Sequence, residues 1–350
     1  MDKAVQGEAI IPAPRETWRE ILQADHNSLV DQTPEWVDCM CAAGQYEDAS
    51  RFYEIAGARM VLPMVRTRSI APWLAVEASN PHAWGIGGLI SDRPLQKEHI
   101  HAVLRDLKGS RTMRTAIRPN PMLGDLWKTG RPSGVLPLPR LAHTLDLEGG
   151  FKQVWEKRFA SYTRTKVRKA EKSGLMIESD TTGRLIPAFY HLLNQSVNRW
   201  AGKQNEPVSL ARWRANRRDP LSKLELIAER MGDRCVVWMA WSQGQPAAAI
   251  IVLKGKNAHS IRGAMNKELA GPTEANTLIQ SMAIEDACNS GCRFYHMGET
   301  GGNPSLAHFK ERFGAEPYAY AEYVIERLPV TAADRWLRTF VKRLIGFKDV

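Results

Sequence analysis

The sequence predicts an α/β or α+β protein made of two modules side by side. The 350 residues correspond to about two domains at roughly 150 residues each. Helical and strand-like stretches alternate in both halves, and 43% of the residues are hydrophobic, enough for a sizeable core. A Gly- and Pro-rich stretch at 130–139 leads to a junction expected at 141–150.

The first half is expected to begin with a short helix over residues 15–24. A second helix should start at Pro34, because Thr33 suits the N-cap and proline suits the first helical position. Apolar residues at helical spacing predict a third helix over 96–107. Strands are expected at 52–56, 58–65, 85–90, 114–117 and 144–147.

The second half repeats this alternation. A helix is expected from Ser161 to Ser173, with Gly174 as its C-terminal signal. Further helices are expected at 185–199, 274–289, 305–313 and 334–348. Strands are expected at 175–179, 224–230, 234–241, 245–253, 258–263, 292–297 and 318–326. The last helix has an apolar stripe opposite basic residues, a pattern that suits packing on the body or docking on tRNA or a membrane surface.

Composition narrows the class of protein. The five cysteines are an odd number spread over a long chain, which does not indicate a disulfide framework. The first residues contain only a short apolar run before Pro12, and the longest apolar run, 247–253, is far below the ~20 residues of a membrane span. We therefore expect a cytoplasmic protein without stable membrane insertion. Cys288, Cys292 and His296 do not make a zinc site, and no metal is expected.

The positive charge lies in the second half. Residues 1–150 contain 17 Lys and Arg against 18 Asp and Glu, whereas residues 151–350 contain 31 against 20. This asymmetry indicates a polyanionic partner such as nucleic acid, or else a basic face that serves solubility. Two segments concentrate the charge: one contains Arg164, Lys166, Arg168 and Lys169, and the other contains Arg212 and Arg214 beside Trp213.

A strand, a Gly-rich loop and a short helix follow one another in YHMGETGGNPSLAHFKERFGAEPY, residues 295–318. A helix N-terminus after a Gly-rich loop can hold an anion, although the loop also suits a simple connection. It is not a Walker loop, because no Gly-Lys-Ser/Thr follows.

Several segments resemble the FemAB-like branch of the GNAT acetyltransferase superfamily, which has two tandem GNAT-like folds. FKERFGAEPY resembles its C-terminal signature, TRTKVRKAEKSGL its basic mid-chain helix, and TPEW an early segment. Trp84-Gly85, Gly87-Gly88-Leu89-Ile90 and the Asn120-Pro121 turn are also similar, and the order agrees over about residues 30–325.

The resemblance implies two domains, 1–145 and 146–328, each a mixed, mostly antiparallel sheet flanked by helices. The second domain would be basic and catalytic, and an amphipathic basic helix, 329–350, would follow it. The implied activity is transfer of an aminoacyl group from a charged tRNA to a small-molecule amine, in cell-wall or natural-product (antibiotic) chemistry.

The resemblance also implies site residues. Lys310 is the expected cation beside the developing oxyanion or the leaving ribose oxygen, with Phe309 anchoring its helix and Glu299 or His308 available as a base. Arg199, Trp200, Trp84 and His308 are assigned to substrate binding. The two basic segments are assigned to tRNA.

Two other functions stay open. Acetyl-CoA enzymes of this superfamily hold pyrophosphate with an Arg/Gln-x-x-Gly-x-Gly/Ala loop, and no window of this sequence meets that pattern. We therefore expect no cofactor, with aminoacyl-tRNA as the co-substrate. An acyl-CoA-dependent N-acyltransferase is the alternative enzyme, and a non-catalytic RNA-binding module is the alternative from another class.

Overall fold

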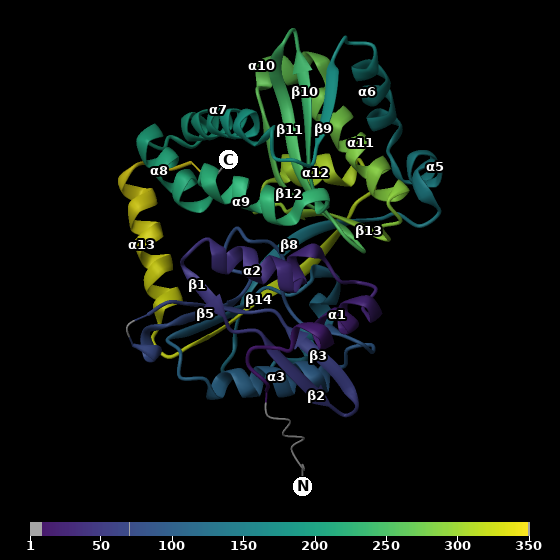
Figure 1. Cartoon of the computed structure of the whole chain (residues 1–350). Helices are drawn as coiled ribbons and strands as arrows, with labels where there is room; N and C mark the ends of the chain where they lie inside the picture. Colours follow the sequence, from purple (N-terminus) through teal and green to yellow (C-terminus); the bar gives the residue numbers. More distant parts are fainter. Residues whose placement is uncertain (1–8, 70, 349–350) are drawn as a thin grey trace. The chain divides into compact units, whose positions relative to one another are not determined.

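A computed structural model describes residues 9–69 and 71–348, and the chain divides into two compact units (Figure 1). Unit 1 comprises the described residues up to Ala142 together with Pro317–Leu328. Unit 2 comprises His143–Glu316 and the described residues from Pro329 onward. The sequence assigned residues 317–328 to the second domain. They group with unit 1 because strand β14 (Glu316–Glu326) pairs antiparallel with β7 (Arg114–Ile117).

The strands of unit 1 form a mixed arrangement. Their order is β1 (Tyr46–Asp48), β4 (Val65–Thr67), β5 (Val76–Ser79), β7 and β14. Neighbours are antiparallel except β5 and β7, which are parallel. A second, small sheet has the order β2 (Arg51–Ile55), β3 (Ala58–Leu62) and β6 (Ile90–Ser91). The helices are α1 (Arg15–Ala24), α2 (Pro34–Ala42), α3 (Lys97–Gly109) and α4 (Gly124–Gly130).

The predicted helices of unit 1 are confirmed. α1 has the expected bounds, and the Thr33 side chain accepts a hydrogen bond from the Trp36 backbone at the start of α2. The apolar face of α3 is fully buried in a core that also contains Trp127 and Tyr323, whose rings stack at 5.5 Å.

The strand predicted at 85–90 is wrong, since only Ile90 and Ser91 are extended and paired. Gly85 has φ +94°, and a Cβ there would lie 2.0 Å from the Asp31 carboxylate. That carboxylate accepts a hydrogen bond from the Ile86 backbone at 2.8 Å. The glycines of this segment thus serve a tight buried loop rather than a strand.

Unit 2 is built on five consecutive strands. Their order is β13 (Phe294–Glu299), β12 (Ala258–Met265), β11 (Gln245–Lys254), β10 (Cys235–Ser242) and β9 (Met176–Asp180). They are antiparallel except β12 and β13, which are parallel. Strand β8 (Leu136–Asp146) begins in unit 1 and ends in unit 2. Each unit therefore has a mostly antiparallel, mixed set of strands with one parallel pair, an α+β arrangement.

Helices cover both faces of these strands. They are α5 (Gly150–Gln153), a π-helical turn (Val154–Arg158), α6 (Ser161–Glu171), α7 (Ile186–Gln204), α8 (Val208–Arg218), α9 (Leu221–Met231), α10 (Lys267–Thr273), α11 (Ala275–Asn289), α12 (Pro304–Glu311) and α13 (Val330–Leu344). α7, α8 and α9 lie on one side of the strands, and α11, α6 and α5 lie on the other (Figure 1).

The strand predicted at 224–230 is also wrong, because the segment belongs to α9. Leu224, Ile227 and Ala228 face inward at helical spacing, and Pro220 precedes the first turn. Lys223 is buried and its ammonium donates to Asp219 at 3.0 Å. A short apolar run taken alone does not separate a buried strand from a buried helix.

Candidate functional site

Lys310 lies in the last turn of α12, and the local sequence explains how this helix starts. Asn303 caps it by accepting a hydrogen bond from the Leu306 backbone at 3.1 Å, and Pro304 occupies the first helical position. Gly298, at the end of β13, has φ +72°, a conformation that glycine adopts without strain. The strand can therefore turn back toward the helix that carries Lys310.

The Lys310 ammonium is buried, with 4% of the residue exposed. Its Nζ donates to the carbonyl oxygens of Gly298 at 2.7 Å and Glu299 at 2.9 Å. Burial lowers the pKa of Lys310 to about 7, although the Glu299 carboxylate opposes this shift. Two backbone carbonyls thus hold the Lys310 ammonium in place.

Phe309 packs α12 onto the core of unit 2. Its ring packs edge-to-face against Phe313 at 5.2 Å, and Phe313 packs against Phe159 at 5.0 Å. These rings belong to the apolar core of unit 2, which fixes the backbone on which Lys310 is carried.

Two buried histidines in this region were not predicted to take part in a site. His143, at the end of β8, has its Nε2 3.5 Å from a Glu311 carboxylate oxygen, an ion-pair distance rather than a hydrogen bond. Burial lowers the pKa of His143, and the nearby Lys310 ammonium lowers it further. His296 on β13 accepts from or donates to Thr144 at 3.2 Å, and burial lowers its pKa to about 3.

These imidazoles are neutral at pH 7 and incompletely satisfied. Among the described residues, both ring nitrogens of His143 and Nε2 of His296 have no hydrogen-bond partner. Buried polar nitrogens without partners are uncommon and call for a functional or solvent explanation. Because both rings are neutral, neither competes with Lys310, whose ammonium carries a positive charge below about pH 7. The histidines lie in strand-like sequence without a motif, so no sequence signal distinguished them from core residues.

Glu299 and His308 differ in position. The backbone of Glu299 holds Lys310, and its side chain is close enough to act on the pKa of that lysine. His308 is an exposed residue of α12 whose Nδ1 lies 3.9 Å from Glu311. The structure brings Glu299, Phe309 and Lys310 together and leaves the His308 side chain at the surface.

Arg199 and Trp200 lie on α7, away from α12 in the sequence. The Arg199 guanidinium donates to the Met265 carbonyl at 2.7 Å, which fastens the end of β12 to α7. Trp200 is exposed, and the Arg199 guanidinium lies 5.9 Å from its ring centre. Trp84 is buried in unit 1, where it packs against Trp36 at 5.9 Å.

The basic residues of α6 have different surroundings. Arg164 donates to the backbone carbonyls of Trp155, Glu156 and Phe159, which close the preceding helical turn. Lys166 pairs with Glu274 at 2.9 Å. Arg168 and Lys169 are exposed.

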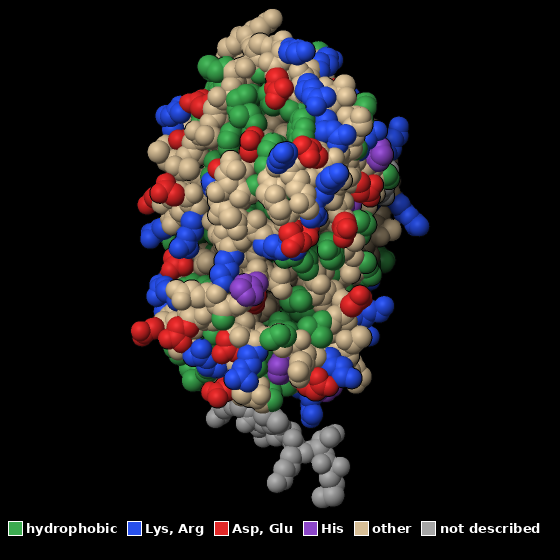
Figure 2. Space-filling model, turned by 90° about the vertical axis from the view of Figure 1, so that its right-hand side faces the viewer, with side chains coloured by type: hydrophobic (Ala, Val, Ile, Leu, Met, Phe, Trp, Pro, Cys, Tyr) green, Lys and Arg blue, Asp and Glu red, His purple; other side chains and the backbone are tan. Residues whose placement is uncertain are grey.

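The start of α6 is joined to the end of α12. The Arg312 carbonyl accepts hydrogen bonds from the Ala160 backbone at 2.9 Å and the Thr163 hydroxyl at 2.8 Å. The exposed ring of Tyr162 lies between the Arg312 guanidinium at 4.4 Å and the Lys166 ammonium at 4.8 Å. The basic residues of α6 therefore lie on a helix whose start is hydrogen-bonded to the end of α12, the helix that carries Lys310. Figure 2 views this side, and Asp and Glu side chains lie among its Lys and Arg side chains.

The second basic segment lies on the other side of the strands, on α8 (Figure 1). Arg212 donates to Asn198 at 2.8 Å, and Arg214 pairs with the buried Glu206 at 2.6 Å. The sequence assigned both basic segments to tRNA binding. The structure places them on opposite sides of the strands of unit 2.

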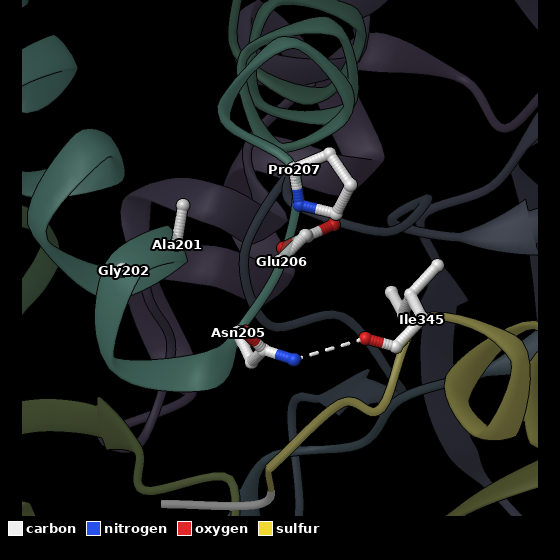
Figure 3. A pocket seen from close by; sticks show the side chains of 6 residues that line it. All are labelled: Ala201, Gly202, Asn205, Glu206, Pro207 and Ile345. Atoms are coloured by element: carbon white, nitrogen blue, oxygen red, sulfur yellow. Dashed lines mark hydrogen bonds between the residues drawn. The ribbon is translucent and has the colours of Figure 1, made fainter.

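A pocket of about 420 Å³ lies where α7 ends (Figure 3). It is lined by Ala201, Gly202, Asn205, Glu206, Pro207 and Ile345. None of the predicted site residues lines it, although Arg214 pairs with its Glu206.

The helix starts that follow β12 are already occupied by side chains. Asn266 accepts hydrogen bonds from the Glu268 and Leu269 backbones at the start of α10. Glu274 stands at the start of α11, where it pairs with Lys166 and accepts from the Thr277 hydroxyl at 3.3 Å. A diphosphate at this second helix start would meet a carboxylate. Within residues 9–69 and 71–348, no group of three or more His, Cys, Asp or Glu side chains is placed to hold a metal ion.

A comparison with protein-family models finds a match over part of the chain. Residues 157–318, almost all of them in unit 2, match the family model described as an acetyltransferase (GNAT) domain. The comparison with curated proteins found no match.

Solved structures extend the likeness to most of the chain. The crystal structure of FemX, a FemAB-family protein, matches with a TM-score of 0.65 at 12% identity, covering 91% of this chain and 97% of FemX. A protein of unknown function from Bacteroides thetaiotaomicron matches with a TM-score of 0.55 at 10% identity, covering 90% and 99%. The C-terminal domain of a protein assigned as a lysylphosphatidylglycerol synthetase from Agrobacterium fabrum matches with a TM-score of 0.50 at 12% identity, covering 94% and 98%. The chain thus has the FemX-like, GNAT-type fold that the sequence predicted.

Proposed function

We propose that this protein transfers an aminoacyl group from a charged tRNA to an amine and forms an amide. The observation that carries the proposal is the buried Lys310 ammonium, oriented by two carbonyls at the end of β13 in the GNAT-type domain. FemX, whose fold this chain shares, is an aminoacyl-tRNA-dependent transferase. The amine would belong to a cell-wall precursor or a natural-product intermediate.

The reaction requires charge stabilisation more than covalent catalysis. The amine attacks the ester carbonyl carbon, a C–N bond forms, and the bond to the ribose oxygen breaks. The amine loses a proton and the ribose oxygen gains one. Lys310 supplies a positive charge to the developing oxyanion and a proton to the leaving oxygen, a role worth about 3–4 kcal/mol for one well-placed donor.

Positioning supplies the remaining acceleration. Because an aminoacyl ester is already activated, holding it beside the amine removes much of the barrier without an enzyme-bound intermediate. The exposed Arg168 and Lys169 of α6 are our candidates for tRNA backbone contacts, since α6 is joined to α12. Arg212 and Arg214 on the opposite layer would contact a different part of the tRNA.

The family description as an acetyltransferase favours one alternative, an acyl-CoA donor. Against it stands the Asn266 cap on α10 and the Glu274 carboxylate at the start of α11, which leave no open anion site at these two helix starts.

A donor competition test separates these functions. The protein is incubated with a pool of tRNAs charged with labelled amino acids and a panel of amines, and mass spectrometry detects new amides. We expect an amide that disappears after ribonuclease treatment and is not restored by acyl-CoA. An amide formed from acyl-CoA in the presence of ribonuclease would contradict the proposal. Binding of tRNA without any amide, across all amines, would instead identify an RNA-binding module.

A further inference from the structure

Helix α13 carries a row of large apolar side chains on its outer surface. The exposed fractions are 70% for Trp336, 54% for Leu337, 54% for Phe340 and 75% for Leu344. Trp336 and Phe340 stack on each other at 5.8 Å. At 100° per residue these four side chains share about 100° of the helix circumference, a single continuous stripe.

The rest of the helix surface is basic. The helix contains Arg335, Arg338, Lys342 and Arg343 against one acidic residue, Asp334, which pairs with Arg338 at 2.8 Å. At helical spacing Arg343 falls beside the stripe, next to Trp336, whereas Arg335, Arg338 and Lys342 fall on the opposite face. The helix is therefore amphipathic, with an apolar stripe on one face and a cationic face opposite it.

The body of unit 2 holds the end of this helix and leaves the stripe uncovered. The Asn205 amide donates to the Ile345 carbonyl at 3.1 Å (Figure 3) and to the Gly346 carbonyl at 3.2 Å, and the Lys348 backbone donates to Gln204 at 2.9 Å. Ile345 also lines the pocket at the end of α7. The helix is fixed by its C-terminal end while its aromatic side chains point outward.

We propose that the stripe of α13 docks this protein onto an anionic lipid surface. Its chemistry matches both layers of such a surface: the aromatic and leucine side chains enter the boundary of headgroups and acyl chains, while Arg343 beside them and the basic face behind them attract the lipid phosphates. A second copy of the chain would bring two helices of the same positive charge together. A nucleic acid would satisfy the cations but leave the row of Leu and Phe side chains in water.

Docking on the surface differs from crossing it. In the part of the chain that the structure describes, no helix is long and apolar enough to span a bilayer. α13 would lie in the plane of the interface. The proposal does not depend on the aminoacyl transfer proposed above, because it rests on α13 alone.

Vesicle flotation of the full chain tests the proposal. We expect binding to vesicles of phosphatidylcholine with phosphatidylglycerol, and much weaker binding to phosphatidylcholine alone. Trp336→Ser combined with Phe340→Ser should lower the partition coefficient at least about tenfold. Arg335→Gln combined with Arg343→Gln should lower it about thirtyfold on the anionic vesicles, at about tenfold per 1.4 kcal/mol, with little change on neutral ones.

The matched control is Trp73→Ser, which removes a tryptophan of unit 1 that is 61% exposed. It should float like the unaltered protein, and circular dichroism should confirm that every variant is folded. The proposal would be overturned if the unaltered protein failed to float at low salt, or if the Trp336/Phe340 variant floated as well as the unaltered protein. It would also be overturned if the unaltered protein were a dimer and only this variant were a monomer. A loss of tRNA affinity in that variant with vesicle binding retained would equally assign the stripe to nucleic acid.

Discussion

At the scale of single residues, the proposed reaction depends on the charge of Lys310. Two backbone carbonyls accept hydrogen bonds from the Lys310 ammonium. Burial nevertheless disfavours the charged form and lowers the pKa of Lys310 to about 7. Its ammonium therefore loses its proton near neutral pH, far below the range of an exposed lysine. The neighbouring His143 and His296 stay neutral and do not compete for the role of cation.

The pH dependence of turnover follows from this pKa. The cation is present below pH 7 and is lost as the pH rises through about 7, so kcat/KM should fall on the alkaline side with an apparent pKa near 7. Lys310→Arg keeps a positive charge at all these pH values. This variant should be slower but should lack the alkaline fall, which a pH series of initial rates will show. An alkaline limb shared by both proteins would assign the titration to another group.

Residue-level prediction from the sequence succeeded where a local rule decides the structure. The Thr33 cap depends on neighbours in the chain, and it is found. The roles of Arg164 and Arg199 were not predictable, because the carbonyls that they bind are brought close only by folding. The same reason hid His143, which approaches Glu311 across 168 positions of sequence.

At the scale of elements, α6 shows that basic residues in one helix have separate tasks. Arg164 satisfies carbonyls at the end of the preceding turn, whereas Arg168 and Lys169 are exposed on the same helix. The sequence assigned all of them to tRNA, and their types and spacing alone do not separate an internal donor from a surface cation.

Alanine variants of α6 measure this division. Arg164→Ala should lower the free energy of unfolding by about 1–2 kcal/mol, because three backbone carbonyls, two of them part-buried, lose their charged donor. Arg168→Ala combined with Lys169→Ala should leave chemical denaturation unchanged. It should weaken tRNA binding and reduce the slope of log Kd against log salt by about two. The assignment to tRNA contacts fails if this double variant binds tRNA with the original salt slope.

Two elements were mispredicted for related reasons. Residues 224–230 are short and apolar, and helical packing against β10 decided their conformation. Residues 85–90 have the apolar composition of a strand, but Asp31 from a distant helical turn binds their backbone and glycine allows its close approach. In both segments tertiary contacts outweighed local pattern, and a single sequence does not contain those contacts.

At the scale of the whole molecule, the two units repeat one plan. Each places a helix between two parallel strands of an otherwise antiparallel set, α3 before β7 in unit 1 and α11 before β13 in unit 2. The similar helix and strand content of the two halves was visible in the sequence. The return of residues 317–328 to unit 1 was not, because that pairing joins segments about two hundred positions apart.

The net charge, unlike the fold, differs between the two halves. Unit 2 holds the GNAT-type domain, Lys310 and both basic segments, whereas residues 1–150 are almost neutral. We infer that unit 2 provides the donor side of the proposed reaction.

The most direct test of the account measures two quantities on one charged tRNA for the unaltered protein and Lys310→Ala. These are the single-turnover rate of amide formation and the dissociation constant of the tRNA. We expect the rate to fall about 10²–10³-fold with the dissociation constant unchanged, since the lysine acts on the transition state and not on tRNA affinity. Equal rates for the two proteins, or a fall explained entirely by lost tRNA binding, would contradict it.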